Sequence, residues 1–338
     1  MSIAEKLIII AENEQKIYDK GYSDNSGINP EWTDWRYFSY QNSRNDLVAK
    51  LKYTDTSKAT DMANMFNGCS TLQSIPLLDT SNVTNMYYMF YGCSALEEVK
   101  LSAPKVTDMS SMFYGCKGLK KAEISNTVNV TNTSSMFNGC SALQSIPLLD
   151  TSNVTDTSGM FTSCSALTEI PQIDTSKATR MVYMFSYCSK ITTIPQIDFS
   201  NASSFQEVFK GCSSLVELPE LNTSNCTSFL GAFYNCTKLK TIAKINFSKC
   251  GTSSTAVTNI FYSCSALENI TIDGVINSSN ISFSPCPKLT HDSLMSLINA
   301  LADRSSTSSY TLKLGATNLA KLTEEEKTIA TDKGWVLN

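Results

Sequence analysis

Residues 89–96 read MFYGCSAL, and close copies recur as MFNGCSTL at 65–72, MFNGCSAL at 136–143 and MFTSCSAL at 160–167. Each copy contains the pattern Phe-x-x-Cys-x-x-Leu/Ile, which occurs ten times. Successive cysteines of this pattern are 24, 23, 24, 24, 24, 24, 24, 28 and 22 residues apart. A period this regular is typical of a solenoid, in which each repeat forms one coil stacked on its neighbours. The long interval before Cys264 predicts a loop that bulges from the stack.

Each repeat divides into a strand-like part, a polar turn and a compact apolar return. The cysteine is followed by Leu-x-x-Ile/Val, often by Pro-x-Leu/Ile-Asp-Thr-Ser, and then by a Met-rich step into the next Phe. Because Asp and Ser side chains can hydrogen-bond nearby backbone N–H groups, the Asp-Thr-Ser segment predicts a turn. The aspartates form a column that could alternatively hold a cation, but turn capping is the better interpretation. They are Asp79, Asp150, Asp174 and Asp198.

The stretch DTSNVTNMYYMFYGCSAL at 79–96 and its copies resemble the leucine-rich repeats, specifically the BspA-like subfamily of bacterial surface proteins. The resemblance covers about residues 48–289. It implies an α/β repeat solenoid, a leucine-rich-repeat-like right-handed stack with a short parallel β-sheet on one face. A proline column departs from the plain strand pattern, and proline cannot donate to a β-ladder. We therefore expect very short strands whose pairing weakens or ends at the prolines, or a column just outside the sheet. The prolines are Pro76, Pro147, Pro171, Pro195 and Pro219.

The cysteine column could serve disulfide formation, metal binding, redox chemistry or packing. No two cysteines have the short C-x₂₋₄-C spacing of a zinc site. Stacked copies would hold their Cβ atoms near the strand spacing of about 4.8 Å, against about 3.8 Å in a disulfide. We therefore predict reduced, buried thiols beside a ladder of stacked phenylalanines, with methionines as pliable filler. Cys226 and Cys250 lie off the column and are the pair most prone to oxidation.

The two ends of the chain predict helical caps. In residues 1–47, a helix at 2–20 precedes an aromatic cluster that contains Trp32 and Trp35. This cluster is interpreted as a cap over the first coil, with a carbohydrate-stacking platform as the alternative. Residues 290–338 predict two helices and an intervening strand, with a capping box between Thr323 and Glu326. Both ends also resemble those of repeat proteins encoded near tail genes in phages of gut bacteria.

Composition and motifs argue against several classes of protein. The net charge is −4 and no dense Lys/Arg cluster occurs, so we predict no nucleic-acid partner. No apolar run approaches the roughly 20 residues of a membrane span, and LIIIA at 7–11 is too short for a secretory signal. The chain has one histidine, His291, and lacks the glycine-rich motifs that cradle phosphate. We therefore expect no enzyme activity, no cofactor, no metal and no membrane insertion.

The remaining prediction is a binding or adhesion module on a bacterial surface or a phage particle. Its partner would be a protein or a glycan on a host or neighbouring cell, read by solvent-facing strand positions that vary between repeats. The alternative is a structural spacer or assembly element of a phage appendage or cell-surface structure. The candidate binding residues, besides the two tryptophans, are Glu98, Lys100, Lys121, Glu123, Glu169, Thr193, Glu217 and Thr241.

Overall fold

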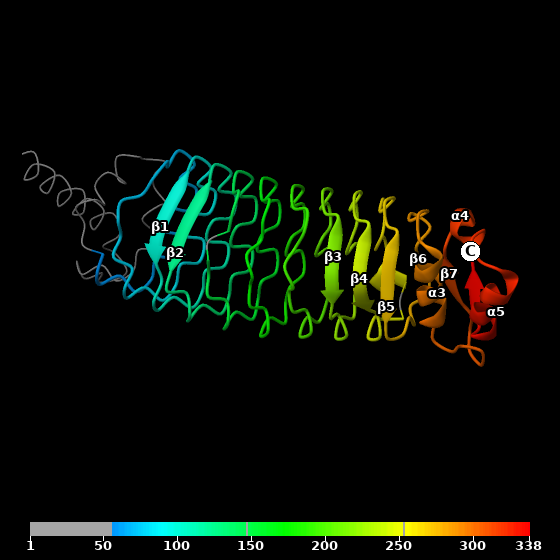
Figure 1. Ribbon diagram of the computed structural model, residues 1–338. Helices are drawn as coiled ribbons and strands as arrows, with labels where there is room; N and C mark the ends of the chain where they lie inside the picture. The colour runs from blue at the N-terminus through cyan, green and yellow to red at the C-terminus, as the bar shows by residue number, and fades with distance from the viewer. Residues whose placement is uncertain (1–55, 147, 253) are drawn as a thin grey trace, which may run out of the picture.

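The computed structural model describes residues 56–146, 148–252 and 254–338. Over this part the chain forms an elongated repeat solenoid with short parallel strands, ending in a small α/β unit (Figure 1). The helix predicted at 2–20 and the aromatic cluster with Trp32 and Trp35 lie outside the described residues. The N-terminal cap therefore stays a prediction.

The strand side of the stack carries two separate parallel sheets. The first pairs β1 (Glu98–Ser102) with β2 (Lys121–Ser125), and the second has the order β3 (Glu217–Leu221), β4 (Thr241–Asn246), β5 (Asn269–Asp273). Within the described chain, the coils that carry four of the five column prolines form no strand. At the fifth, the strand pairing is weakened but does not end, which is one of the two expected outcomes. Pro219 lies inside β3, and the register passes over it from Leu218↔Ile242 to Glu220↔Lys244.

The opposite side of each coil is the return segment, residues 61–69 in the first described coil. Its backbone bonds directly to the next coil: Phe66 N–H donates to Met89 O at 2.8 Å, and Gly68 N–H donates to Tyr91 O at 2.7 Å. The intervening N–H groups instead close turns within their own coil. The same pattern repeats along the stack, and isolated parallel bridges run from Asp61↔Asn85 to Asp156↔Arg180. The return segments, rather than the strands, therefore provide the more continuous backbone connection between coils.

Each return segment needs left-handed backbone at two positions. The second position is often glycine, for example Gly68 at φ 78° and Gly92 at φ 71°. The first position is rarely glycine, and non-glycine residues there cost roughly 1–2 kcal/mol each. The repeated backbone bonds must offset this strain. The residues at the first position are Asn64, Tyr88, Ser111, Ser135, Gly159, Tyr183, Glu207, Gly231 and Asn259.

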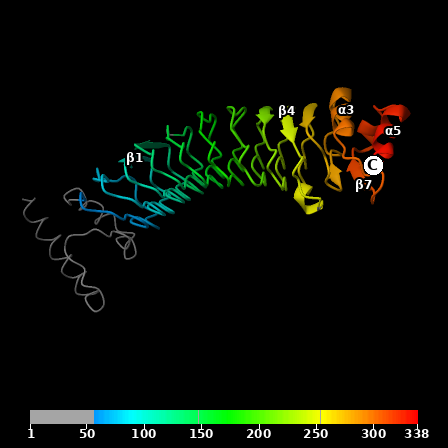
Figure 2. The ribbon, with the colours of Figure 1, turned by 90° about the horizontal axis from the view of Figure 1, so that it is seen from below.

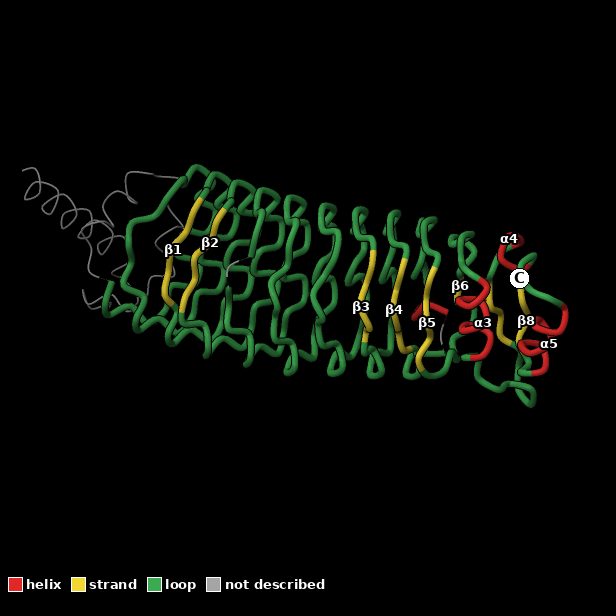
Figure 3. The backbone as a smooth tube through the Cα atoms, viewed as in Figure 1, coloured by secondary structure: helices red, strands yellow, loops and turns green. Residues whose placement is uncertain are grey.

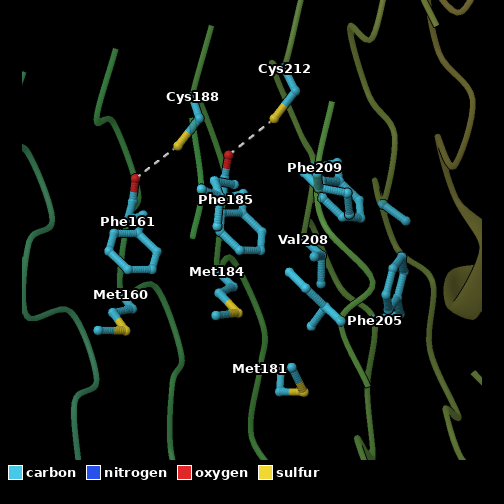
Figure 4. Close-up of a cluster of buried hydrophobic side chains, with 14 of the residues drawn as sticks. Met160, Phe161, Met181, Met184, Phe185, Cys188, Phe205, Val208, Phe209 and Cys212 are labelled. Atoms are coloured by element: carbon cyan, nitrogen blue, oxygen red, sulfur yellow. Dashed lines mark hydrogen bonds between the residues drawn. The ribbon is translucent and has the colours of Figure 1, made fainter. Parts of the chain in front are cut away.

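The interior is a ladder of phenylalanine rings, as predicted. From Phe66 to Phe261, consecutive rings of the column lie 5.2 to 6.1 Å apart between centroids and within 10° of parallel. Met160 and Met184 lie next to the ladder with their side chains buried (Figure 4). The predicted Asp turns are also confirmed, since Asp79 Oδ1 accepts from Ser81 N at 2.9 Å and its equivalents do the same.

The C-terminal unit contains the predicted helices together with elements that were not predicted. Thr290 caps α3 (His291–Asn299), and Thr323 and Glu326 form the predicted capping box of α5 (Glu324–Asp332). A further sheet with the order β6-β7-β8 completes the unit (Figure 3). Strand β7 (Tyr310–Lys313) is the predicted intervening strand, and the elements that were not predicted are β6 (Ile281–Ser282), α4 (Ala316–Leu319) and β8 (Trp335–Leu337). No helix among the described residues is long and apolar enough to cross a membrane.

The stack is bent, with the strand side along the outer edge of the bend and the opposite side along the inner edge. Strands β1 and β4 follow the outer edge in Figure 2, whereas the short helix η1 (Ser254–Val257) lies at the inner edge. This helix forms in the bulge predicted before Cys264, and Phe229 N–H donates to Ala256 O within it at 2.7 Å. The return segments therefore line the inner edge of the bend.

Removing one ring should interrupt the ladder. Phe137 is fully buried between Phe113 and Phe161, at 5.4 and 5.9 Å. We expect Phe137→Ala to lower the free energy of unfolding by about 3–5 kcal/mol, as buried Phe truncations do. Urea denaturation followed by circular dichroism measures this loss, and a value below about 1 kcal/mol would contradict a core role.

Candidate functional site

A cluster of tyrosines lies on the solvent side of the return segments near the N-terminal end of the described stack. The Tyr87 and Tyr88 rings stack at 3.9 Å, and Tyr91 meets Tyr88 edge-on at 4.8 Å. In the next coil, Tyr114 stacks on Tyr91 at 4.8 Å with the rings within 9° of parallel. All four side chains are partly exposed. The patch therefore combines four partly exposed aromatic side chains from two adjacent coils.

A second cluster lies on the same side of later coils and is built around a lysine. Lys210 Nζ lies 5.7 Å from the centre of the Tyr187 ring and 5.5 Å from that of Tyr234. Glu207 accepts from the same ammonium group at 2.7 Å, and this hydrogen bond raises the pKa of Lys210. Tyr262 extends the cluster by stacking on Tyr234 at 4.7 Å. The lysine is therefore held in a fixed place between aromatic rings.

Local backbone geometry determines where the Tyr187 ring can lie. Tyr187 is 47% exposed and occupies a left-handed position at φ 60°. Its ring packs over Gly211, where an added Cβ would lie 2.6 Å from ring atom Cδ1. Gly211 therefore makes room for the ring, and no larger residue fits there. We call the two clusters together the tyrosine face: Tyr87, Tyr88, Tyr91, Tyr114, Tyr187, Lys210, Tyr234 and Tyr262.

The candidate residues on the strand side fall into separate groups. Glu98, Lys100, Lys121 and Glu123 lie together on β1 and β2, with Glu98 opposite Lys121 and Lys100 opposite Glu123 in the register. Lys100 and Lys121 both pair with Glu123, at 3.3 and 2.6 Å. These pairs are exposed to solvent, so each contributes little to stability.

The other strand-side candidates do not join this group. Glu217 and Thr241 are register partners on β3 and β4. Glu169 and Thr193 are exposed on coils that form no strand. An open groove of about 400 Å³ runs beside these coils, where Gln172 Nε2 donates to Gln196 O and Gln196 Nε2 donates to Glu220 O, both at 2.8 Å. The groove presents amides and carboxylates but holds no cluster of three potential metal ligands among the described residues.

The cysteines of the column are buried and free of disulfides, as predicted, and so are Cys226 and Cys250, which lie off the column. The column also has a role that packing arguments missed. Cys188 Sγ donates to Phe161 O and Cys212 Sγ to Phe185 O, each at 3.1 Å, in the preceding coil (Figure 4). Burial raises the pKa of Cys188 to about 12. A thiol that stays protonated is neither a nucleophile nor a metal ligand, so the column joins coils and does not form a reactive site.

Sequence reasoning missed the tyrosine face because the tyrosines do not form one column. Tyr91, Tyr114, Tyr234 and Tyr262 each directly follow a ladder phenylalanine, whereas Asn, Thr, Ser or Lys follows the others. The usable signal was the position after each ladder Phe, which is at least partly exposed in the other coils, although Ser186 is buried. His291, predicted as a lone cap histidine, is the first residue of α3 and bonds Glu326 Oε1 at 2.7 Å.

The chain matches one protein family and is similar to solved leucine-rich repeat structures. A family model described as "Mycoplasma protein of unknown function, DUF285" matches residues 35–145, 98–194 and 168–274. Among solved structures, a T. pallidum leucine-rich repeat protein is 19% identical, with 61% of this chain and 77% of that chain covered and a TM-score of 0.33. A leucine-rich cell surface protein from Faecalibacterium prausnitzii A2-165 is 20% identical, with 64% and 78% covered and a TM-score of 0.31. No curated protein matches the chain.

The thiols should be inert in the folded protein. Because the folded pKa of Cys116 and Cys188 is about 12, against an ordinary value of 9.0, the fold favours the protonated thiol. The contribution of these protonated thiols to the free energy of unfolding is therefore fully present below about pH 9, and it should be lost as the pH rises toward 12. At pH 8 we expect no reaction of the native chain with a disulfide reagent such as DTNB, and reaction of all twelve cysteines after unfolding. A thiol that reacts faster than the chain unfolds would contradict this assignment.

Proposed function

The chain belongs to the family described as "Mycoplasma protein of unknown function, DUF285", and we propose that it is a non-enzymatic binding module. It recognises a protein or a glycan through the solvent-facing surface of its repeats. The observation that carries this proposal is the tyrosine face, where aromatic rings and Lys210, which lies between two of them, are positioned by the hydrogen-bonded return segments. Tyrosine is enriched at interfaces because it combines a large apolar area with a polar tip.

The contrast between inward and outward positions of the return segment supports this choice of surface. Inward positions repeat the same Phe and Cys from coil to coil, with Met or another apolar residue before most of the phenylalanines, and the Phe and Cys side chains are buried throughout. Outward positions change residue type while the backbone beneath them keeps one geometry. Side chains fixed in this way lose little entropy when a partner binds, which favours affinity. The strand-side candidates Glu169, Thr193, Glu217 and Thr241 form a second, more dispersed candidate surface.

We place the site of action at a bacterial surface or on a phage particle. The resemblance of the repeats to BspA-like surface proteins supports this location, and the phage association rests on the ends of the chain. Labelling of intact source cells with a membrane-impermeant reagent tests the first location. Detection of the chain in purified phage particles tests the second.

Partner binding can be tested with variants that leave the scaffold intact. We suggest Tyr187→Asn together with Tyr262→Ser, because asparagine tolerates the left-handed backbone at position 187 better than most residues. Against a partner identified on protein and glycan arrays, this variant should bind at least about tenfold more weakly, as loss of hot-spot tyrosines does.

The matched control changes the strand side by Glu217→Gln and Thr241→Val. It should leave binding within about twofold, the effect typical of peripheral contacts. The reverse result would move the binding surface to the strand side. If the arrays yield no partner and deletion of the protein leaves cell attachment unchanged, the binding proposal fails in favour of a structural spacer.

A further inference from the structure

The outward side chains of four successive coils form a pattern that is reversed in charge about its centre. The central two coils carry β1 and β2, and the outer two contain the identical stretches 73–84 and 144–155. All of the side chains concerned are exposed. In coil order, the first two columns are Gln73, Glu97, Lys120, Gln144 and Ser74, Glu98, Lys121, Ser145. The third column is the residue before the next inward-facing aliphatic side chain of each coil: Leu77, Lys100, Glu123, Leu148. Its two leucines come five residues after the leucine that follows the cysteine motif, and its two charged residues come four residues after it.

Each column therefore has matching neutral ends and opposite charges in the middle. The ends of the third column are unusual, since Leu77 is 87% exposed and Leu148 is 82% exposed. They are separated by three coil steps, or about 15 Å at the usual strand spacing. Two leucines so fully exposed, at equal distances from a charged centre, do not contribute to the core of a single chain. They would be buried if this surface met a second copy of itself.

We propose that this patch binds a second copy of the same chain. The two copies face each other across a two-fold axis that runs parallel to the strands, midway between β1 and β2. Such an axis keeps the strand direction and reverses the order of the coils. It places Leu77 against the partner's Leu148, and Leu148 against the partner's Leu77. A contact of this kind, in which the same patch is used by both copies, closes on itself and gives a dimer.

The same rotation makes every charge meet its opposite. Lys100 faces the partner's Glu123, and Glu98 faces the partner's Lys121. Within one copy, Lys120 pairs with Glu97 at 3.0 Å, and the glutamate side chain remains 58% exposed. The carboxylates and ammonium groups thus retain accessible surface for a partner. A rotation that paired each coil with its own copy would separate Leu77 from Leu148, so the leucines favour the reversed order.

The size of the patch sets the strength of the contact. Four coils about 4.8 Å apart and strands of about 3.3 Å per residue give a patch of roughly 400 Å². This is about half of the 800 Å² per partner in a standard interface, and the outward bend of the strand side limits it further (Figure 2). We therefore expect a weak dimer with a dissociation constant of about 0.1–1 mM, strengthened where many copies are held together.

Charge reversal in the full chain provides the first test. An acidic variant carries Lys100→Glu, Lys120→Glu and Lys121→Glu, and a basic variant carries Glu97→Lys, Glu98→Lys and Glu123→Lys. In sedimentation equilibrium at low salt, the natural chain should self-associate, and each variant alone should do so at least about tenfold more weakly. An equimolar mixture of the two variants should associate again, because every opposed charge is then complementary.

Several results of this experiment would overturn the proposal. They are a natural chain that stays monomeric at 1 mM, variants that associate as the natural chain does, and a mixture that does not recover. Circular dichroism and thermal unfolding of each variant establish that it is folded before the comparison. The tyrosine face is unchanged in these variants, so their binding to an array partner separates a failed dimer from a failed binding module.

A cross-linking experiment tests the orientation. Mixing a Leu77→Cys variant with a Leu148→Cys variant under mild oxidation should give a disulfide-linked heterodimer, whereas either variant alone should stay largely monomeric. The twelve natural cysteines are buried and do not compete. Efficient cross-linking of Leu77→Cys to itself, or none in the mixture, would exclude the proposed two-fold axis.

Discussion

The backbone hydrogen bonds between return segments are the constraint on which the rest of the structure depends. Alternate N–H groups of one return segment donate to carbonyls of the next coil, and the others close turns within their own coil. The Phe66 carbonyl accepts both Cys69 N–H and the Cys93 thiol, each at 3.0 Å, so both of its lone pairs are used. This arrangement allows little variation in the length of the return segment. The strand side carries the variation instead, including one-residue differences in repeat length and the prolines.

The same contrast between constant return segments and a variable strand side determines which features could be predicted from the sequence. The Phe, Cys and Asp columns and the capping box of α5 were predictable because each repeats or follows a local rule. The thiol hydrogen bonds were not, because burial alone does not reveal which carbonyl a thiol will reach. The continuation of β3 through Pro219 was not predictable either, because it depends on Leu218 and Glu220 both pairing with β4 on either side of the proline. The tyrosine face depends on outward positions whose residue type changes irregularly along the stack, so periodicity could not reveal it.

The stack is not equally tight along its length. The hydroxyl of the threonine that follows the Asp or Asn of each turn usually donates to the next coil, as Thr127 does to Asp150 O at 3.2 Å and Thr175 to Asp198 O at 2.7 Å. Thr151 is buried between these two, and its hydroxyl has no partner. The ring spacing also widens there, from 5.4 Å for Phe113–Phe137 to 5.9 Å for Phe137–Phe161. The strand side forms no sheet at this junction, so local opening should cost less here than between coils joined by strand pairing.

The near-identity of two coils affects how such a chain is inherited. Residues 65–84 and 136–155 differ only at Thr71 and Ala142, so their coding sequences offer long matching tracts for recombination. Exchange between the tracts removes or duplicates 71 residues, which is three whole coils, and rejoins the same sequence at the junction. Because each coil contacts only its neighbours, the product still stacks. A shortened descendant would lose β1 and β2 with their charges but keep the second tyrosine cluster, so the two surfaces can be gained or lost separately.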